Sequence, residues 1–146
     1  MVNACKDHVI DTGPTGVIGH TGTDNTSPFD RIEKYGTWET SAAENIAYGE
    51  TTGLGVMLSL MIDDGVAGRG HRYNIMNPAF KVTGPYSGTH KTYGHQSCLT
   101  YAVGFTPKGS SGGGGGGDTG STGSGTLTET QYRTLDDEVF AEQNKL

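Results

Sequence analysis

The chain has 146 residues, of which 32% are apolar and 25 are glycine, with a net charge of −6 and an isoelectric point of about 5.2. This length fits one domain of ordinary size and an additional segment. The acidic balance, without a basic run, argues against nucleic-acid binding, because the main electrostatic contribution would be repulsive. No run approaches the roughly 20 apolar residues of a membrane-spanning helix, and the first residues lack the apolar core of a signal peptide.

The first part of the chain contains two segments that begin or end with residues typical of helix termini. Residues 2–12 place apolar side chains on one stripe at helical spacing, and Gly13-Pro14 predicts that this helix ends there. Ser27 is a suitable N-cap residue and Pro28 suits the first helical position, so we expect a second helix over 27–36. Between these helices the chain forms a polar, glycine-rich loop.

A third helix is predicted over residues 52–63, with the wide apolar face of a helix that covers a sheet. The apolar residues of this face are Leu54, Val56, Met57, Leu60 and Met61. The sequence Asp63-Asp64-Gly65 predicts its end. The following stretch, Gly68–Pro78, is expected to be a loop that holds His71 between a glycine and an arginine.

Two strands are expected after this loop. The first lies around Phe80–Thr83. The second, Ser97–Phe105, alternates two sets of small or apolar residues, which is typical of a strand buried on both faces. Helices followed by strands predict an α+β domain in which the helices pack on an antiparallel sheet.

The end of the chain differs in composition from the domain, which we expect to occupy residues 1–106. Residues 107–125 include six consecutive glycines and are expected to form a disordered linker, because they bury too little surface to offset the entropy of ordering. The last segment, 126–146, is a candidate amphipathic helix. Its apolar face comprises Tyr132, Leu135, Val139 and Phe140. Such a helix is marginal alone in water, so it should dock or continue into further chain.

The two cysteines, Cys5 and Cys98, leave two interpretations open. They are either buried thiols, which behave as small apolar residues, or one disulfide that joins the two ends of the domain. The cellular compartment decides between them. Two cysteines without a Cys-x-x-Cys spacing do not indicate a metal cluster.

The five histidines differ in context. His8 lies beside the apolar stripe of the first helix and is expected to be a hydrogen-bonded, partly buried residue. His90 and His95 lie in a polar loop and are expected to be exposed. His20 and His71 sit among glycines and turns, which allow the backbone to aim a side chain into a cleft.

Glu44 lies in an Ala-Ala-Glu-Asn-Ile run, and a carboxylate buried there needs a partner, for which an imidazole is suitable. Two histidines and a carboxylate in one cleft can bind a divalent metal such as zinc or carry out acid–base chemistry. They can also form a polar network that only fixes the fold. Spacing alone favours that network, because no compact metal-binding motif is present.

Several motifs, taken in order, resemble the CAP superfamily of cysteine-rich secretory proteins, antigen-five allergens and pathogenesis-related proteins, which share the SCP-like domain. The resemblance covers roughly residues 2–106 and depends on the order and spacing of its parts. These parts are His20, the Phe29–Gly36 helix, Ala43–Gly49 with Glu44-Asn45-Ile46, Asp63-Asp64-Gly65-Val66, Arg69–Ile75 with Gly70-His71-Arg72, and the strand ending Ala102-Val103-Gly104-Phe105.

The resemblance implies a three-layer α-β-α sandwich with an antiparallel central sheet, and a family opening helix that is missing here. It also implies a shared cleft formed by His20, Glu44, Asp63 and His71. Asp63 stands where the family usually has a glutamate, and its shorter side chain is a departure from the pattern. The two histidines are the implied ligands of zinc or another divalent cation, and no other cofactor is implied.

Family members are mostly secreted, so the resemblance implies an extracellular protein and a chain truncated at its N-terminus. A Cys5–Cys98 disulfide is then favoured. The implied function is a secreted binding module without established catalytic activity, whose partner is a sterol, another lipid or an extracellular protein. The alternative is a metal-assisted, protease-like hydrolase with Glu44 as general base, which the lack of an activated nucleophile disfavours.

Overall fold

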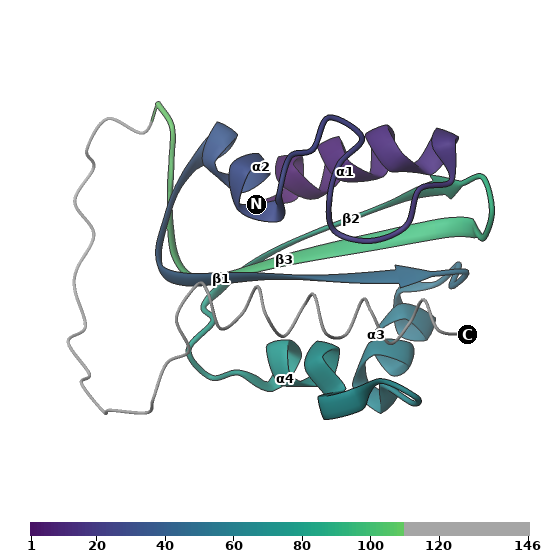
Figure 1. The fold of residues 1–146 in the computed structure, drawn as a ribbon. Helices are drawn as coiled ribbons and strands as arrows, with labels where there is room; N and C mark the ends of the chain where they lie inside the picture. Colours follow the sequence, from purple (N-terminus) through teal and green to yellow (C-terminus); the bar gives the residue numbers. More distant parts are fainter. Residues whose placement is uncertain (110–146) are drawn as a thin grey trace.

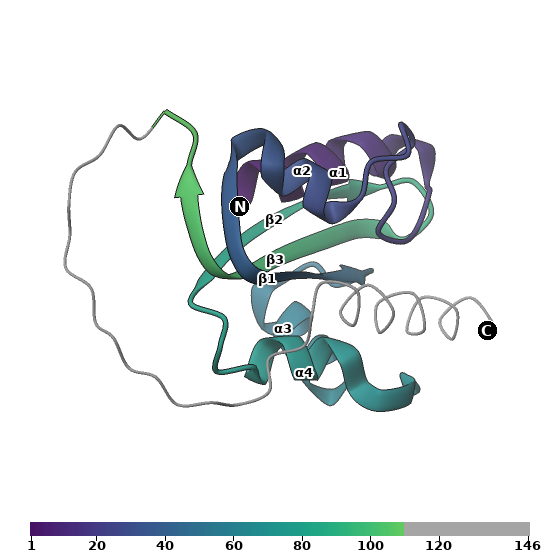
Figure 2. The ribbon, with the colours of Figure 1, turned by 60° about the vertical axis from the view of Figure 1, so that its left-hand side comes forward.

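The fold, seen in a computed structural model that describes residues 1–109, is a three-layer sandwich (Figure 1). Its elements are α1 (Val2–Thr15), α2 (Pro28–Tyr35), β1 (Gly36–Tyr48), α3 (Gly53–Ile62), the short 3-10 helix η1 (Ala67–Arg69), α4 (Gly70–Met76), β2 (Val82–His90) and β3 (Gly94–Pro107). Helices α1 and α2 cover one face of the sheet, and α3 and α4 cover the other, as a second view also shows (Figure 2). The predicted α+β sandwich is confirmed.

The sheet is antiparallel, with the strand order β1-β3-β2. Strand β3 pairs with β1 from Gly36↔Pro107 to Tyr48↔Gln96, with a register shift between Glu39 and Ala42. On its other edge β3 pairs with β2, so it is the central strand. Its middle residues are buried by the helical layers, which confirms the expectation of a strand with two covered faces.

Helix α1 does not end at Gly13, as the sequence predicted, but continues through Pro14 to Thr15. Gly13 instead allows α1 to approach β2, because a Cβ atom at this position would lie 2.3 Å from the carbonyl oxygen of Thr89. The helix ends at Gly16, whose φ of 79° is the left-handed conformation favoured by glycine. The second helix is confirmed: the Ser27 hydroxyl accepts a hydrogen bond from the Asp30 amide, 3.2 Å away.

Strand β1 was missed from the sequence, so the expected order of helices followed by strands was wrong. Its inner half, Ala42–Ala47, is buried on both sides and therefore lacks the alternation of polar and apolar residues that marks a half-exposed strand. The segment is extended because it pairs with β3, about 50 to 60 residues further along the chain. A local pattern does not report such a distant partner.

Two expected loops are regular structure. The stretch around His71 contains helix α4, which has no side-chain N-cap. Strand β2 extends to His90, well beyond the predicted end at Thr83. His90 was expected to be exposed, but only 2% of its surface is accessible, because its ring packs against Tyr48 and its Nε2 lies 3.2 Å from the Val17 carbonyl oxygen.

The core lies on both faces of the sheet. One group packs under α3 and comprises Ala43, Ala47, Val56, Leu60, Leu99 and Tyr101. The other packs under α1 and α2 and includes Ala4, Phe29, Ile32, Ala42 and Ala102. A disulfide between Cys5 and Cys98 joins α1 to β3 on this second face, which confirms the pairing and excludes the two free thiols.

The predicted linker lies outside the described residues from residue 110 onward, as does the whole of the predicted helix 126–146; β3 itself runs to Pro107. Within residues 1–109, none of the helices has the length and apolar character needed to span a bilayer.

Candidate functional site

Strand β1 sends consecutive side chains to opposite faces of the sheet, and this alternation divides the polar groups of the site. Glu44 follows Ala42 toward α1 and α2, where its carboxylate meets α2. Asn45 follows Ala43 toward α3 and α4, where its amide meets the backbone of α4. Glu44 and Asn45 therefore contact different helical layers.

Glu44 is fully buried and is held by two partners. Arg31 of α2, 2% exposed, contacts both carboxylate oxygens through Nη2 at 3.0 and 2.9 Å, and His20 contacts Oε1 through Nδ1 at 3.0 Å. Burial by itself raises the pKa of Glu44, but the charge of Arg31 and the hydrogen bond from His20 outweigh it and lower the pKa to about 2. Glu44 is therefore a carboxylate at neutral pH.

The loop that carries His20 is fixed through its neighbour Gly19. The Gly19 carbonyl oxygen lies 2.8 Å from Nε2 of the buried His8, and the Gly19 amide donates to the Tyr48 hydroxyl at 2.8 Å. Burial lowers the pKa of His8, so its ring is neutral and donates from Nε2. His8 is thus a hydrogen-bonded core residue, as expected, although it is buried more completely than expected.

Asp63 joins the end of α3 to the start of α4. It ends α3 in the left-handed conformation, with φ of 53°. Its Oδ2 accepts hydrogen bonds from the amides of His71 at 3.0 Å and Arg72 at 3.2 Å, and its Oδ1 lies 2.8 Å from His71 Nδ1. Burial raises the pKa of Asp63, but the hydrogen bond and charge of His71 outweigh it, so the pKa is lowered.

Two asparagines support this pair and were not identified from the sequence. Asn45 donates from Nδ2 to the carbonyl oxygen of His71 at 3.0 Å, and Asn74 donates to Asn45 Oδ1 at 2.8 Å. Both are buried. The available signal was the position of Asn45 beside Glu44 in an apolar run, because a buried amide requires partners just as a carboxylate does.

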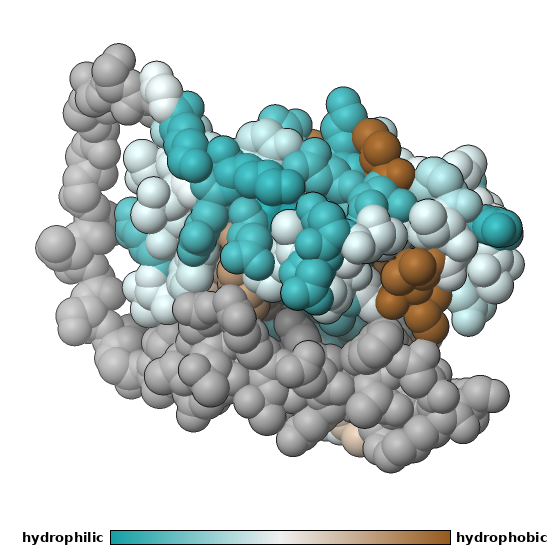
Figure 3. All heavy atoms as spheres, turned by 45° about the horizontal axis from the view of Figure 1, so that its top comes forward, coloured by the Kyte–Doolittle hydropathy of each residue, from teal (hydrophilic) through white to brown (hydrophobic). Residues whose placement is uncertain are grey.

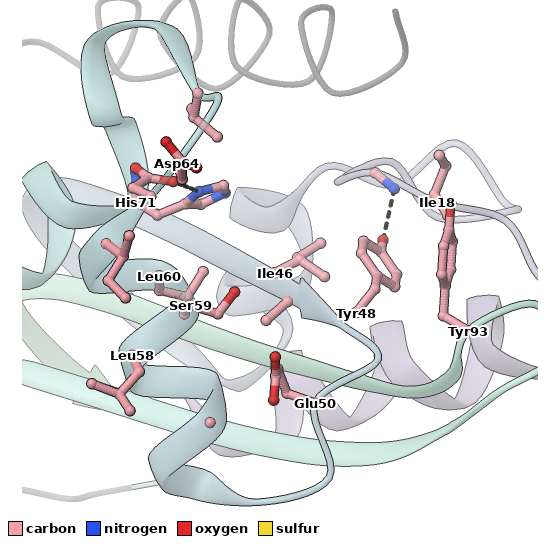
Figure 4. A pocket seen from close by; sticks show the side chains of 16 residues that line it. Ile18, Ile46, Tyr48, Glu50, Leu58, Ser59, Leu60, Asp64, His71 and Tyr93 are labelled. Carbon is pink, nitrogen blue, oxygen red and sulfur yellow. Dashed lines mark hydrogen bonds and ion pairs between the residues drawn. The ribbon is translucent and has the colours of Figure 1, made fainter. Parts of the chain in front are cut away.

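A cavity of about 670 Å³ lies between the end of β1, helix α3 and the loop of Gly19. It is lined by Ile18, Gly19, Ile46, Ala47, Tyr48, Glu50, Gly55, Leu58, Ser59, Leu60, Ile62, Asp63, Asp64, Val66, His71 and Tyr93. Figure 4 shows the His71 ring at one side and Tyr48 and Tyr93 at the other. The walls combine apolar side chains with three carboxylates, and no lysine or arginine is among these residues.

The four residues that the sequence assigned to one cleft form two pairs. Asp63 and His71 line the cavity, and Asp63 reaches His71 despite its shorter side chain. Glu44 and His20 form the second pair, in which Glu44 points to the opposite face of the sheet. Neither of these two is among the residues that line the cavity, although Gly19, next to His20, is. The assignment of all four residues to one cleft therefore stays a prediction.

Cys5, Glu44 and Cys98 bring possible metal-ligand atoms within 4.8 Å of one another. The chemistry of this group does not suit a metal in this state. The two sulfur atoms are joined in a disulfide and are not thiolates, which are the sulfur ligands that zinc takes. Glu44 is already engaged by Arg31.

The layered fold is that of a CAP-type domain. The profile of the cysteine-rich secretory protein family, CAP, matches residues 1–104, and the chain belongs to this family. Membership of this family supports the interpretation of the chain as an extracellular SCP-like module.

Among solved structures, the chain is similar to an outer surface protein from Borrelia burgdorferi, with a TM-score of 0.56 and 20% identity over 68% of this chain and 69% of that one. This likeness shows the fold alone. A comparison with curated proteins gave no match.

Proposed function

We propose that the protein is an extracellular SCP-like binding module that holds a divalent cation, such as zinc, through His20 and His71. The observation that carries the proposal is the repeated pairing of an imidazole Nδ1 with a carboxylate, at 3.0 Å for His20–Glu44 and 2.8 Å for His71–Asp63. Metal-binding histidines usually donate their second N–H to a carboxylate, which fixes the tautomer and makes the other nitrogen a better ligand.

The chemistry of the donors fits such an ion. With Nδ1–H directed at a carboxylate, the lone pair of each ring that can bind a metal lies on Nε2. Neutral imidazole is a preferred ligand of zinc. The carboxylates of Glu50, Asp63 and Asp64 give the cavity beside His71 a negative potential that favours a cation. An extracellular location is supported by the family.

A lipid or sterol is a second candidate ligand for the same module, and the cavity walls favour it. Apolar side chains such as Ile46, Leu58 and Leu60 line a volume of about 670 Å³, which is within the usual range for small-molecule sites. A fatty-acid or sterol binding assay with purified protein tests this candidate.

The hydrolase alternative is less well supported by the geometry. A general base must reach the proton that it removes, but Glu44 has no exposed surface and is bound by Arg31 through both oxygens. A carboxylate with a pKa of about 2 is also a weak base at neutral pH.

Removing either histidine should weaken zinc binding by at least about tenfold to a hundredfold, because each supplies one ligand and the loss of even a residue that orients a ligand typically costs that much. Calorimetric titration of zinc into the native chain, His20→Ala and His71→Ala measures this change. At pH 5 the native chain should also bind more weakly than at pH 7.5, because a ligating imidazole must be unprotonated.

His95→Ala is the matched control, because His95 lies at the start of β3 and is outside both pairs. It should leave zinc binding unchanged. Equal affinity in the native chain, His20→Ala and His71→Ala would refute the two-histidine site.

A further inference from the structure

Helix α3 has an apolar side that the described part of the domain leaves uncovered. Its ten residues include no charged side chain, and only Val56 and Leu60 are buried against the sheet. On the opposite side Leu54, Leu58 and Ile62 recur at four-residue spacing and therefore form one stripe. These three residues, the α3 stripe, are 71%, 51% and 55% exposed. A helix that is apolar on both sides is usually covered on both.

The neighbouring helix α4 adds to this apolar surface. Met57 of α3 is exposed, and so are Tyr73 and Met76 of α4. The face formed by α1 and α2 is instead mainly hydrophilic and shows only separate apolar patches (Figure 3). An apolar surface that is gathered on one layer and bordered by polar residues is typical of a site that binds a partner.

The two ends of the α3 stripe carry opposite charges. At the first turn, the carboxylate of Glu50 lies against Gly55, since a Cβ atom there would collide with its Oε2. Beyond the last turn, Arg69 donates from Nη1 to the carbonyl oxygen of Ile62, and Arg72 donates to the same oxygen from Nη2 at 2.8 Å. Glu50 and Arg69 are both exposed. Each charge also suits the dipole of the helix end that it borders.

The acidic residues that follow α3 do not cancel the charge of these arginines. Asp63 is buried and paired with His71, and Asp64 lines the cavity. Neither Arg69 nor Arg72 is among the residues that line the cavity. The segment that follows α3 therefore contributes two guanidinium groups against one remaining carboxylate, and its net charge is positive.

Two copies of such a helix are complementary when they pack antiparallel. A twofold axis at Leu58 places Leu54 of one copy against Ile62 of the other, so each apolar side chain meets an apolar partner. The same symmetry brings the Glu50 end of each copy to the Arg69 end of the other, and both of these pairs have opposite charge. A phospholipid surface would match the stripe but not both ends, because its phosphates attract only the arginines.

We propose that the protein associates with a second copy of itself through an antiparallel pair of α3 helices. One helical face and its surroundings form a small interface of the transient class, with a dissociation constant on the order of 100 μM. Because Glu50, Leu58 and Ile62 also line the cavity, the α3 helix of the partner borders each cavity. The association requires no metal ion and is independent of the proposed zinc site.

Sedimentation velocity on the full chain, from about 10 μM to about 1 mM, brackets this dissociation constant. The native chain should pass from monomer to dimer across the range. Leu54→Gln/Leu58→Gln should associate at least about tenfold more weakly, because it places four amides at the centre of the interface. Both positions are exposed, so the domain should stay folded.

Val2→Gln/Ile10→Gln is the matched control. These two apolar residues are also exposed, at 47% and 56%, but they lie on α1 in the other layer. This variant should associate like the native chain.

Reversal of the end charges tests the antiparallel arrangement. Arg69→Glu and Glu50→Arg should each weaken association by about tenfold, because each replaces two pairs of opposite charge with two pairs of like charge. The double variant Glu50→Arg/Arg69→Glu should restore the native affinity, since both pairs are opposite again. Loss of the Arg69 contact with Ile62 would not be repaired in this way, so the double variant separates an effect on the interface from an effect on folding.

A monomer at every concentration would overturn the proposal. A dimer that survives Leu54→Gln/Leu58→Gln would do the same, as would a double charge variant that stays as weak as its single variants. Flotation with phosphatidylcholine vesicles completes the test, and the native chain should not float. Flotation that depends on the α3 stripe, by a chain that stays monomeric in solution, would assign this face to a lipid surface and would equally overturn the dimer.

Discussion

Replacing Arg31 with methionine should destabilise the fold by about 3–5 kcal/mol, because it leaves the Glu44 carboxylate buried without its charged partner. Arg31 also donates from Nη1 to the Thr26 carbonyl oxygen at 3.0 Å, so its loss loosens the loop that carries His20. Urea-induced unfolding of the native chain and Arg31→Met measures the difference.

Lys34→Met is the matched control on the same helix, because the Lys34 side chain is 48% exposed and lies 3.9 Å from Asp7. It should cost less than about 1 kcal/mol. Glu44→Gln in the Arg31→Met background should recover part of the lost stability, because it removes the unpaired charge. A cost for Arg31→Met no larger than that for Lys34→Met would contradict the buried pair.

Acid provides an independent check on Glu44. Its pKa falls from 4.5 to about 2 on folding, so its contribution to stability is complete above pH 4.5 and disappears as the pH drops toward 2. The shift corresponds to about 3 kcal/mol. Glu44→Gln should therefore lose less stability over this pH range than the native chain. An equal loss in both chains would mean that groups other than Glu44 cause it.

Removing the Cys5–Cys98 disulfide should destabilise the domain by about 4–5 kcal/mol, because the bond closes a loop with a sequence separation of 93 residues and restricts the unfolded chain. Both sulfur atoms are buried, so the exchange to alanine also leaves space between α1 and β3. Thermal and urea unfolding of Cys5→Ala/Cys98→Ala, with the reduced native chain for comparison, measures the loss. Unchanged stability in both would show that the bond does not constrain the fold.

Local signals predicted some elements well. Ser27, Pro28 and Asp30 define the start of α2 through contacts within one turn, so three adjacent residues are sufficient. Gly13 was misread because glycine ends helices but also permits close packing, and only the position of β2 distinguishes these roles. The limit is physical, since the deciding contact lies far away in sequence.

The strands show the same limit. β3 was recognised because small and apolar residues fill both of its covered faces. β1 is also buried, but Glu44 and Asn45 interrupt its apolar residues, so its sequence does not show the pattern of a buried strand. His90 looked like a loop residue because glycines and threonines surround it. Its burial depends on Tyr48, from β1, and on the loop that contains Val17.

The site was only partly accessible from the sequence. Family resemblance identified His20, Glu44 and His71, and Asp63 proved to be the partner of His71. Arg31 was missed, although a buried glutamate requires a cation and an arginine beside Ile32 in a short amphipathic helix is a natural candidate. The division into two pairs follows from the alternation of β1, which was not recognised as a strand.

Nitrogen-15 spectra of the histidine rings during zinc titration test the proposed metal site most directly. Both His20 and His71 should carry the proton on Nδ1, directed at Glu44 and Asp63, and their Nε2 signals should shift as zinc is added. The Nε2 signals of His8, His90 and His95 should remain in place. Zinc-dependent shifts confined to those three rings, or no shift in His20 and His71 at saturating zinc, would contradict the site.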